Sequence, residues 1–144
     1  MGNVQVFILS QKKDHKKTIT ICHHILKQND FENIFYKELK NSLKADKDLL
    51  KSQNIYDLFD YIVGADQVEN DKPDPEMIFK TADELNVDLK NIVMVGDSIV
   101  DMEMGRRAVV GLVVGVLEGG VATRKDLEKD ADIVINSVRN IKLI

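Results

Sequence analysis

One stretch, residues 91–108, restricts the fold of this chain more than any other. It opens with four apolar residues, 92–95, a short unbroken run that is typical of a strand buried on both faces. Gly96 then permits a sharp turn, and Asp97 follows at the point where the strand should end. Asp101 comes four positions later, one helical turn into the next segment. The stretch therefore predicts a strand, a tight turn and a helix, with two carboxylates at their junction.

Two carboxylates that converge at a strand end predict a cation site. Asp97 and Asp101 would repel each other unless a cation lay between them, and hard oxygen ligands of this kind suit Mg²⁺. In a competing interpretation, Asp97 only caps the helix and Asp101 is a solvated surface charge. The residues of this stretch alone leave both interpretations open.

The rest of the chain repeats this alternation of apolar strands and helices. We expect one domain over residues 1–144, because a chain of this length can bury a sizeable core. The predicted fold is α/β with a doubly wound parallel sheet, in which ligands bind beyond the carboxyl ends of the strands. The apolar spacing predicts strands at 4–9, 61–63, 92–95, 109–116 and 133–135, and helices at 15–28, 76–86 and 123–129.

Residues 31–57 do not fit this alternation. The segments 26–35 and 50–59 resemble each other at an offset of 24 positions, and residues 36–52 between them carry helical apolar spacing. Two copies are too few for a solenoid. We therefore predict a helical insertion at about 31–57.

Composition restricts the partners and the compartment. The formal net charge of −4 argues against a nucleic-acid surface. Cys22 is the only cysteine, so no internal disulfide can form and a reducing compartment is favoured. No apolar run approaches the roughly 20 residues that span a membrane, and the N-terminus lacks a signal-peptide pattern. The sequence predicts a cytoplasmic protein without a nucleic-acid or membrane partner.

A second motif completes a family pattern. Residues 71–75 read Asp-Lys-Pro-Asp-Pro and follow the apolar segment 61–63, and a predicted helix separates them from Gly-Asp-Ser-Ile-Val-Asp at 96–101. Two motifs in this order and spacing closely resemble the haloacid dehalogenase (HAD) superfamily, and within it the phosphoglycolate-phosphatase-like branch. The resemblance runs from about residue 58 to the C-terminus.

The resemblance implies a HAD-like Rossmannoid core and a Mg²⁺-dependent phosphatase that acts on a small phosphorylated substrate. Lys72 would be the lysine that neutralises the phosphate, and Asp97 and Asp101 would hold Mg²⁺. Ser98 would join the phosphate site. Ser10, at the end of the strand 4–9, would supply the hydroxyl of the family's second motif, which hydrogen-bonds the phosphate.

The assignment of Ser10 has two alternatives. A lone hydroxyl at a strand end is also typical of a plain turn or cap residue. In another register, residues 33–36 form the second-motif strand, Lys37 replaces the hydroxyl, and the strand 4–9 is a relic of the first motif.

The resembled family needs an aspartate nucleophile, which comes from an Asp-x-Asp-Gly-Thr motif after its first strand. No such sequence exists in this chain. The resemblance therefore implies a member truncated at the N-terminus, without the central nucleophile strand and without a cap domain. We expect weaker Mg²⁺ binding as one consequence. The flanking strands should either have unpaired edges or rearrange. A second copy of the chain, or a separate N-terminal chain, would have to complete the site.

Two functions remain open from the sequence. The chain is a phosphatase-type hydrolase that is inactive alone, or a non-catalytic module that binds phosphate, a metal or a protein partner. A phosphoacceptor receiver domain would need an acidic pair at the first strand end, where Ser10 and Gln11 stand. A histidine metal site is not expected, because the adjacent His23 and His24 would point in different directions on a helix.

Overall fold

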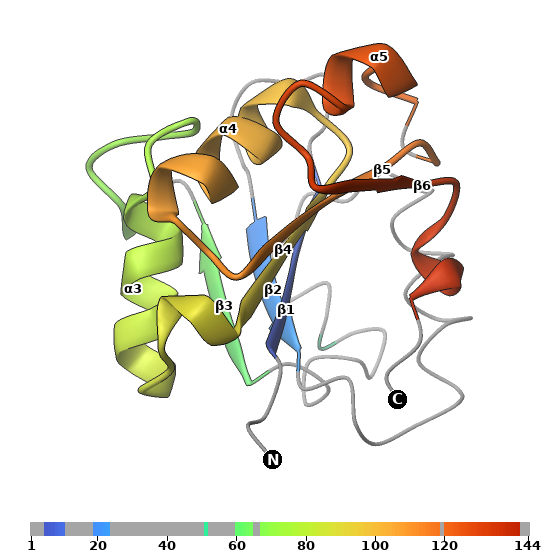
Figure 1. The fold of residues 1–144 in the computed structure, drawn as a ribbon. Coiled ribbons are helices and arrows are strands. Elements are labelled where there is room, and N and C mark those ends of the chain that lie inside the picture. The colour runs from blue at the N-terminus through green and yellow to red at the C-terminus, as the bar shows by residue number, and fades with distance from the viewer. Residues whose placement is uncertain are drawn as a thin grey trace.

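A mixed six-stranded sheet forms the centre of the molecule (Figure 1). The computed structural model describes residues 5–10, 19–23, 51, 60–64, 67–118 and 120–141. The strand order is β3-β2-β1-β4-β5-β6. The strands are β1 (Gln5–Ser10), β2 (Ile19–His23), β3 (Tyr61–Gly64), β4 (Ile92–Gly96), β5 (Leu112–Val116) and β6 (Ile133–Ile135).

Five of these strands run in one direction. β1 pairs in parallel with β4, β4 with β5, and β5 with β6. β2 is antiparallel to both of its neighbours, β1 and β3, so β3 runs in the same direction as the four parallel strands. The predicted α/β fold is confirmed, and β2 is the one strand that departs from a fully parallel sheet.

The helix predicted at residues 15–28 is wrong where the structure describes that segment. Residues 19–23 form β2, with Ile19 paired to Ser10 on one side and to Gly64 on the other. The sequence Ile-Thr-Ile-Cys-His is rich in β-branched residues, which favour a pleated strand. Pairing with two neighbouring strands outweighs the helical apolar spacing, as tertiary context often does.

The strand β1 lies directly beside β4, so β4 is paired on both sides. An unpaired edge, one of the two outcomes that we expected, is not found there. The position of β1 fits the alternative in which the strand 4–9 is a relic of the first-motif strand.

The helices α3 (Glu76–Leu85), α4 (Ile99–Ala108) and α5 (Arg124–Leu127) lie on one face of the sheet (Figure 1). From β3 onward the chain moves across the sheet in one direction, through β4 and β5 to β6. Right-handed crossovers in one direction place every connecting helix on the same face. Two short 3₁₀ turns, Leu89–Asn91 and Val138–Asn140, complete the described elements.

The core lies between this helical layer and the sheet. Its buried members come from α3, α4 and the strands, and include Met77, Ile78, Ile92, Met94, Met102, Met104, Val113 and Leu127. Gly105 lets α4 approach closely, because a Cβ there would stand 2.9 Å from both Met94 Cγ and Val113 Cγ2. The core fixes α3 and α4, the two helices that follow the motifs of interest.

The predicted element boundaries hold with two corrections. The helix at 76–86 is confirmed as α3, with Pro75 at its N-cap and Asn86 as a left-handed C-cap. The strand predicted at 109–116 begins only at Leu112, because Val109 is the left-handed C-cap of α4 with φ 56°. The helix predicted at 123–129 is the shorter α5. The helical insertion predicted at about 31–57 lies outside the described residues apart from Lys51, so the insertion and the single domain stay predictions.

Candidate active site

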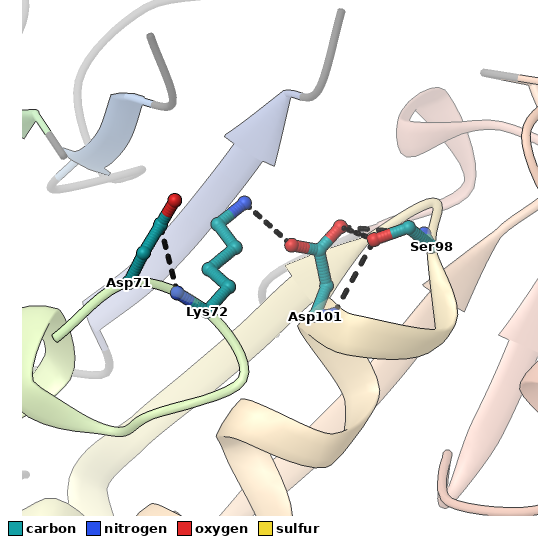
Figure 2. Close-up of polar contacts among 4 residues, drawn as sticks. All are labelled: Asp71, Lys72, Ser98 and Asp101. Atoms are coloured by element: carbon teal, nitrogen blue, oxygen red, sulfur yellow. Dashed lines mark hydrogen bonds and ion pairs between the residues drawn. The ribbon is translucent and has the colours of Figure 1, made fainter. Parts of the chain in front are cut away.

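The carboxyl edge of the sheet brings the motif-bearing strands together. β1 and β4 are parallel, and Leu9 pairs with Gly96 in their register. Ser10 is the last residue of β1 and Asp97 is the first residue after β4, so the two strands end side by side. The loop that carries Lys72 follows β3 and leads into α3, and it approaches α4 at the same place (Figure 2).

The junction between β4 and α4 is built by a capping box. Ser98 is the N-cap of α4: its Oγ accepts a hydrogen bond from the Asp101 N–H at 3.3 Å. In return, Asp101 Oδ2 accepts from the Ser98 N–H at 3.3 Å and from its hydroxyl at 2.6 Å. Serine at the N-cap with an acceptor three residues on is the arrangement that satisfies the free N–H groups of a helix start. The competing interpretation is therefore wrong on both residues, since Ser98 caps the helix and Asp101 is fully buried.

The other oxygen of Asp101 pairs with Lys72. Lys72 Nζ lies 2.6 Å from Asp101 Oδ1, and the two side chains are 1% and 0% exposed (Figure 2). Burying both charges is costly, and it persists only where geometry and further hydrogen bonds compensate. Ser98 supplies that compensation at Oδ2. The ammonium group of Lys72 is thereby held at the edge of the sheet where Asp97 also lies.

Gly96 permits this crowding. A Cβ at Gly96 would stand 2.4 Å from Asp101 Cβ, far inside contact distance. Only glycine allows the end of β4 to pass this close to the first turn of α4. The glycine that the sequence marked as a turn residue thus has a second role, which is to admit the Asp101 side chain.

Asp97 is the least satisfied group at this edge. Among the buried side-chain nitrogen and oxygen atoms that the structure describes, only Asp97 Oδ1 has no hydrogen-bond partner. Burial, and next the charge of Asp101, raise the pKa of Asp97 from 3.8 to about 6, although Lys72 acts in the opposite direction. A buried carboxylate oxygen without a partner needs a cation or a donor to offset its desolvation.

A cation such as Mg²⁺ would satisfy this oxygen. Asp97 would hold the ion through Oδ1, while both oxygens of Asp101 already have partners in the protein. The ion would supply positive charge against the oxygens of a bound phosphate. Within the described residues no group of three or more His, Cys, Asp or Glu side chains could hold a metal. The assignment of Asp97 and Asp101 as a ligand pair stays a prediction.

Of the predicted site residues, the structure brings Lys72, Ser98 and Asp101 into direct contact, with Asp97 next to them. Ser10 reaches the same edge through its backbone position alone. Sequence reasoning missed that Asp101 is the buried partner of Lys72. The two residues are 29 positions apart, and no local pattern signals the pair.

A sequence profile of the family described as haloacid dehalogenase-like hydrolase matches residues 40–114, just over half of the chain. The chain belongs to this family. The matched segment contains β3, α3, β4, α4 and the whole Lys72–Asp101–Ser98 contact.

Curated relatives each match about half of this chain. It is 42% identical over 73 residues to a phosphonoacetaldehyde hydrolase of Bacillus cytotoxicus, covering 48% of this chain and 27% of the relative. It is 39% identical over 80 residues to a phosphoglycolate phosphatase of Neisseria meningitidis, covering 56% of this chain and 33% of the relative. The matches span about a third or less of the length of these relatives.

A solved structure extends the likeness to the fold. The β-phosphoglucomutase of Clostridium difficile matches with a TM-score of 0.58 and 28% identity, covering 78% of this chain and 51% of that one. The HAD-like hydrolase therefore has the Rossmann-like core of its family. None of its described helices has the length and apolar character that crossing a bilayer requires.

Proposed function

We propose that this HAD-like hydrolase binds a small phosphomonoester at the carboxyl edge of its sheet, with the substrate class of a Mg²⁺-dependent phosphatase. The observation that carries the proposal is the buried Lys72–Asp101 pair beside the free oxygen of Asp97. A lysine and a metal-seeking carboxylate at one strand edge suit a dianionic phosphate. The names of the curated relatives, a phosphoglycolate phosphatase among them, support the same substrate class.

Each residue has a distinct role in this proposal. The ammonium group of Lys72 offsets the charge of the phosphate, and Asp101 keeps that group in place. Asp97 holds Mg²⁺, which supplies the second positive charge. Ser98 stabilises α4 and Asp101, and its buried hydroxyl already has an acceptor, so we assign it a role in orientation.

Turnover requires a nucleophile that the described site does not show. The strand β1 ends at Ser10 next to Asp97, where a carboxylate would be needed to attack phosphorus. A carboxylate from a second copy or from a separate N-terminal chain would complete the site. Without one, the chain acts as a non-catalytic module, and the uncharged end of β1 is the observation that favours this second function.

Hydrolysis of a generic phosphomonoester in the presence of Mg²⁺ separates the two functions. If the chain is an enzyme, release of inorganic phosphate should be saturable and should be lost in Asp97→Asn. If it is a module, the wild-type chain should bind inorganic phosphate with Mg²⁺ but release none from the ester. Failure of the wild-type chain to bind phosphate at all would contradict both functions.

A further inference from the structure

The loop that carries Lys72 is tied down by a side chain outside the family motifs considered above. Glu76, the first residue of α3, turns its carboxylate back over the preceding segment. Its Oε1 accepts a hydrogen bond from the Glu69 N–H at 2.8 Å. Its Oε2 accepts from the Asn70 N–H at 2.8 Å and from Asn70 Nδ2 at 3.0 Å. One carboxylate thus gathers three donors from two residues that lie shortly before Lys72.

Two further carboxylates continue this organisation up to the helix. Asp71 Oδ1 accepts from the Lys72 N–H at 2.7 Å (Figure 2), and the Asp71 carbonyl accepts from the Asp74 N–H at 3.0 Å. Asp74 Oδ1 accepts from the Glu76 N–H at 3.0 Å. The backbone on both sides of Lys72 is therefore held by charge-assisted hydrogen bonds, which are the stronger class.

The anchor of this network is a rigid element. Glu76 directly precedes Met77 and Ile78, which are fully buried in the core. The position of its carboxylate is thus fixed by the packing of α3 against the sheet. A loop tied to such an anchor loses the freedom that exposed loops of this length otherwise have.

Lys72 is the residue of this loop that depends most on a fixed backbone position. Its long side chain must keep Nζ within hydrogen-bond reach of a carboxylate on another helix, and both groups are buried. A displacement of its backbone would separate the two charges and leave each without a partner. The Lys72 side chain cannot readily compensate for such a displacement, because its ammonium group and the Asp101 carboxylate are both buried.

We propose that Glu76 is the positioning residue for Lys72: by clamping the N–H groups of Glu69 and Asn70, it holds the lysine in its buried pair with Asp101. The inference rests on the proposed function only in that Lys72 would be the phosphate ligand. The clamp itself is a property of the free protein. It can be tested without any ligand.

The test measures the accessibility of the Lys72 amine. A brief pulse of an acylating reagent labels lysines according to exposure, and mass spectrometry compares Lys72 with the exposed Lys125 in the same sample. In Glu76→Ala we expect labelling of Lys72 to rise about tenfold relative to Lys125, with faster hydrogen exchange at Glu69 and Asn70, because the loop opens locally. The melting temperature should change little. Glu76→Gln, which keeps one acceptor oxygen, should fall between the wild type and Glu76→Ala.

The matched control is Glu128→Ala. Glu128 is an exposed glutamate that directly follows α5, and its carboxylate forms an ion pair with Arg124 Nη1 at 3.7 Å. This variant should leave the labelling of Lys72 unchanged. The proposal is overturned if Lys72 is labelled as slowly in Glu76→Ala as in the wild type, or if Glu76→Ala only lowers the melting temperature. A wild-type chain that fails to bind phosphate would contradict the proposed function and leave this result intact.

Discussion

At the scale of single residues, the buried carboxylate of Asp97 lowers the stability of the fold at neutral pH. In the metal-free protein its folded pKa is raised from 3.8 to about 6, chiefly by burial. Between these two values the folded state holds a proton that the unfolded state has lost. Stability is therefore fully present below the unfolded pKa, and it is lost as the pH rises through about 6. The cost at neutral pH is what a bound cation would offset.

The variant Asp97→Asn tests this cost. The amide has no charge to desolvate, so the variant should be more stable than the wild type at pH near 7.5, on the order of 1 to 3 kcal/mol. At pH near 3, below both pKa values, the two proteins should be about equally stable, because Asp97 is then largely protonated in both the folded and unfolded states. Chemical denaturation measures the difference in unfolding free energy between the variant and the wild type at each pH. A difference that is the same at both pH values would contradict this explanation.

A carboxylate introduced at position 10 should strengthen the cation site. The register pairs Leu9 with Gly96, so Ser10 and Asp97 each follow a paired residue, and Ser10→Asp adds a further acidic residue beside Asp97 at this edge. We expect about tenfold tighter Mg²⁺ binding by calorimetry, since the affinity of Mg²⁺ rises with the number of carboxylate oxygens available to it. The control Asn91→Asp adds the same charge before β4, at the opposite edge, and should change the affinity less than about twofold. Equal affinities for both variants would contradict the placement of Ser10.

At the scale of elements, the start of α4 links stability to the site. Ser98 caps the helix and also donates to Asp101 Oδ2, whereas Thr123 caps the short α5 and is exposed. Ser98→Ala should cost roughly 2 kcal/mol or more, because it removes a cap and leaves a buried oxygen with a poorer partner. Thr123→Ala should cost about 1 kcal/mol or less. Thermal unfolding of the two variants compares these losses of stability. Equal losses would mean that the burial of Ser98 adds nothing to the effect of its helix cap.

Elements with a local signal were predictable from the sequence. The apolar run of β4, the strand β6 and the helix α3 follow from spacing and from Pro75 alone. The strand β2 was not predictable, because its spacing resembles a helix and its pairing partners are distant in sequence. The start of β5 was missed because Val109 adopts a left-handed conformation that β-branched residues rarely take.

The candidate site shows the same division. The spacing of Asp97 and Asp101 and the glycine before them are local, and they placed two carboxylates at a strand end. The contact between Lys72 and Asp101 depends on how α3 and α4 pack, so only the fold reveals it. Glu76 accepts hydrogen bonds from the N–H groups of Glu69 and Asn70, which lie only a few residues earlier in the chain. No sequence pattern distinguishes this glutamate from an ordinary residue at a helix start.

At the scale of the whole molecule, the protein carries a net charge of −4, and the proposed ligand is an anion. A long-range field of that sign disfavours phosphate, so binding has to come from local groups. Lys72 and a cation on Asp97 are those groups in our account. The two should therefore depend on each other, since phosphate and Mg²⁺ each reduce the repulsion that the other ligand meets.

The measurement that tests this claim most directly is a calorimetric titration of inorganic phosphate with and without Mg²⁺. Linkage predicts that Mg²⁺ tightens phosphate binding by about tenfold in the wild type, and that phosphate tightens Mg²⁺ binding by the same factor. The double variant Lys72→Met/Asp101→Asn, which removes both charges of the buried pair together, should lose phosphate binding and stay folded. Phosphate binding that is independent of Mg²⁺, or equally tight in the double variant, would contradict the account.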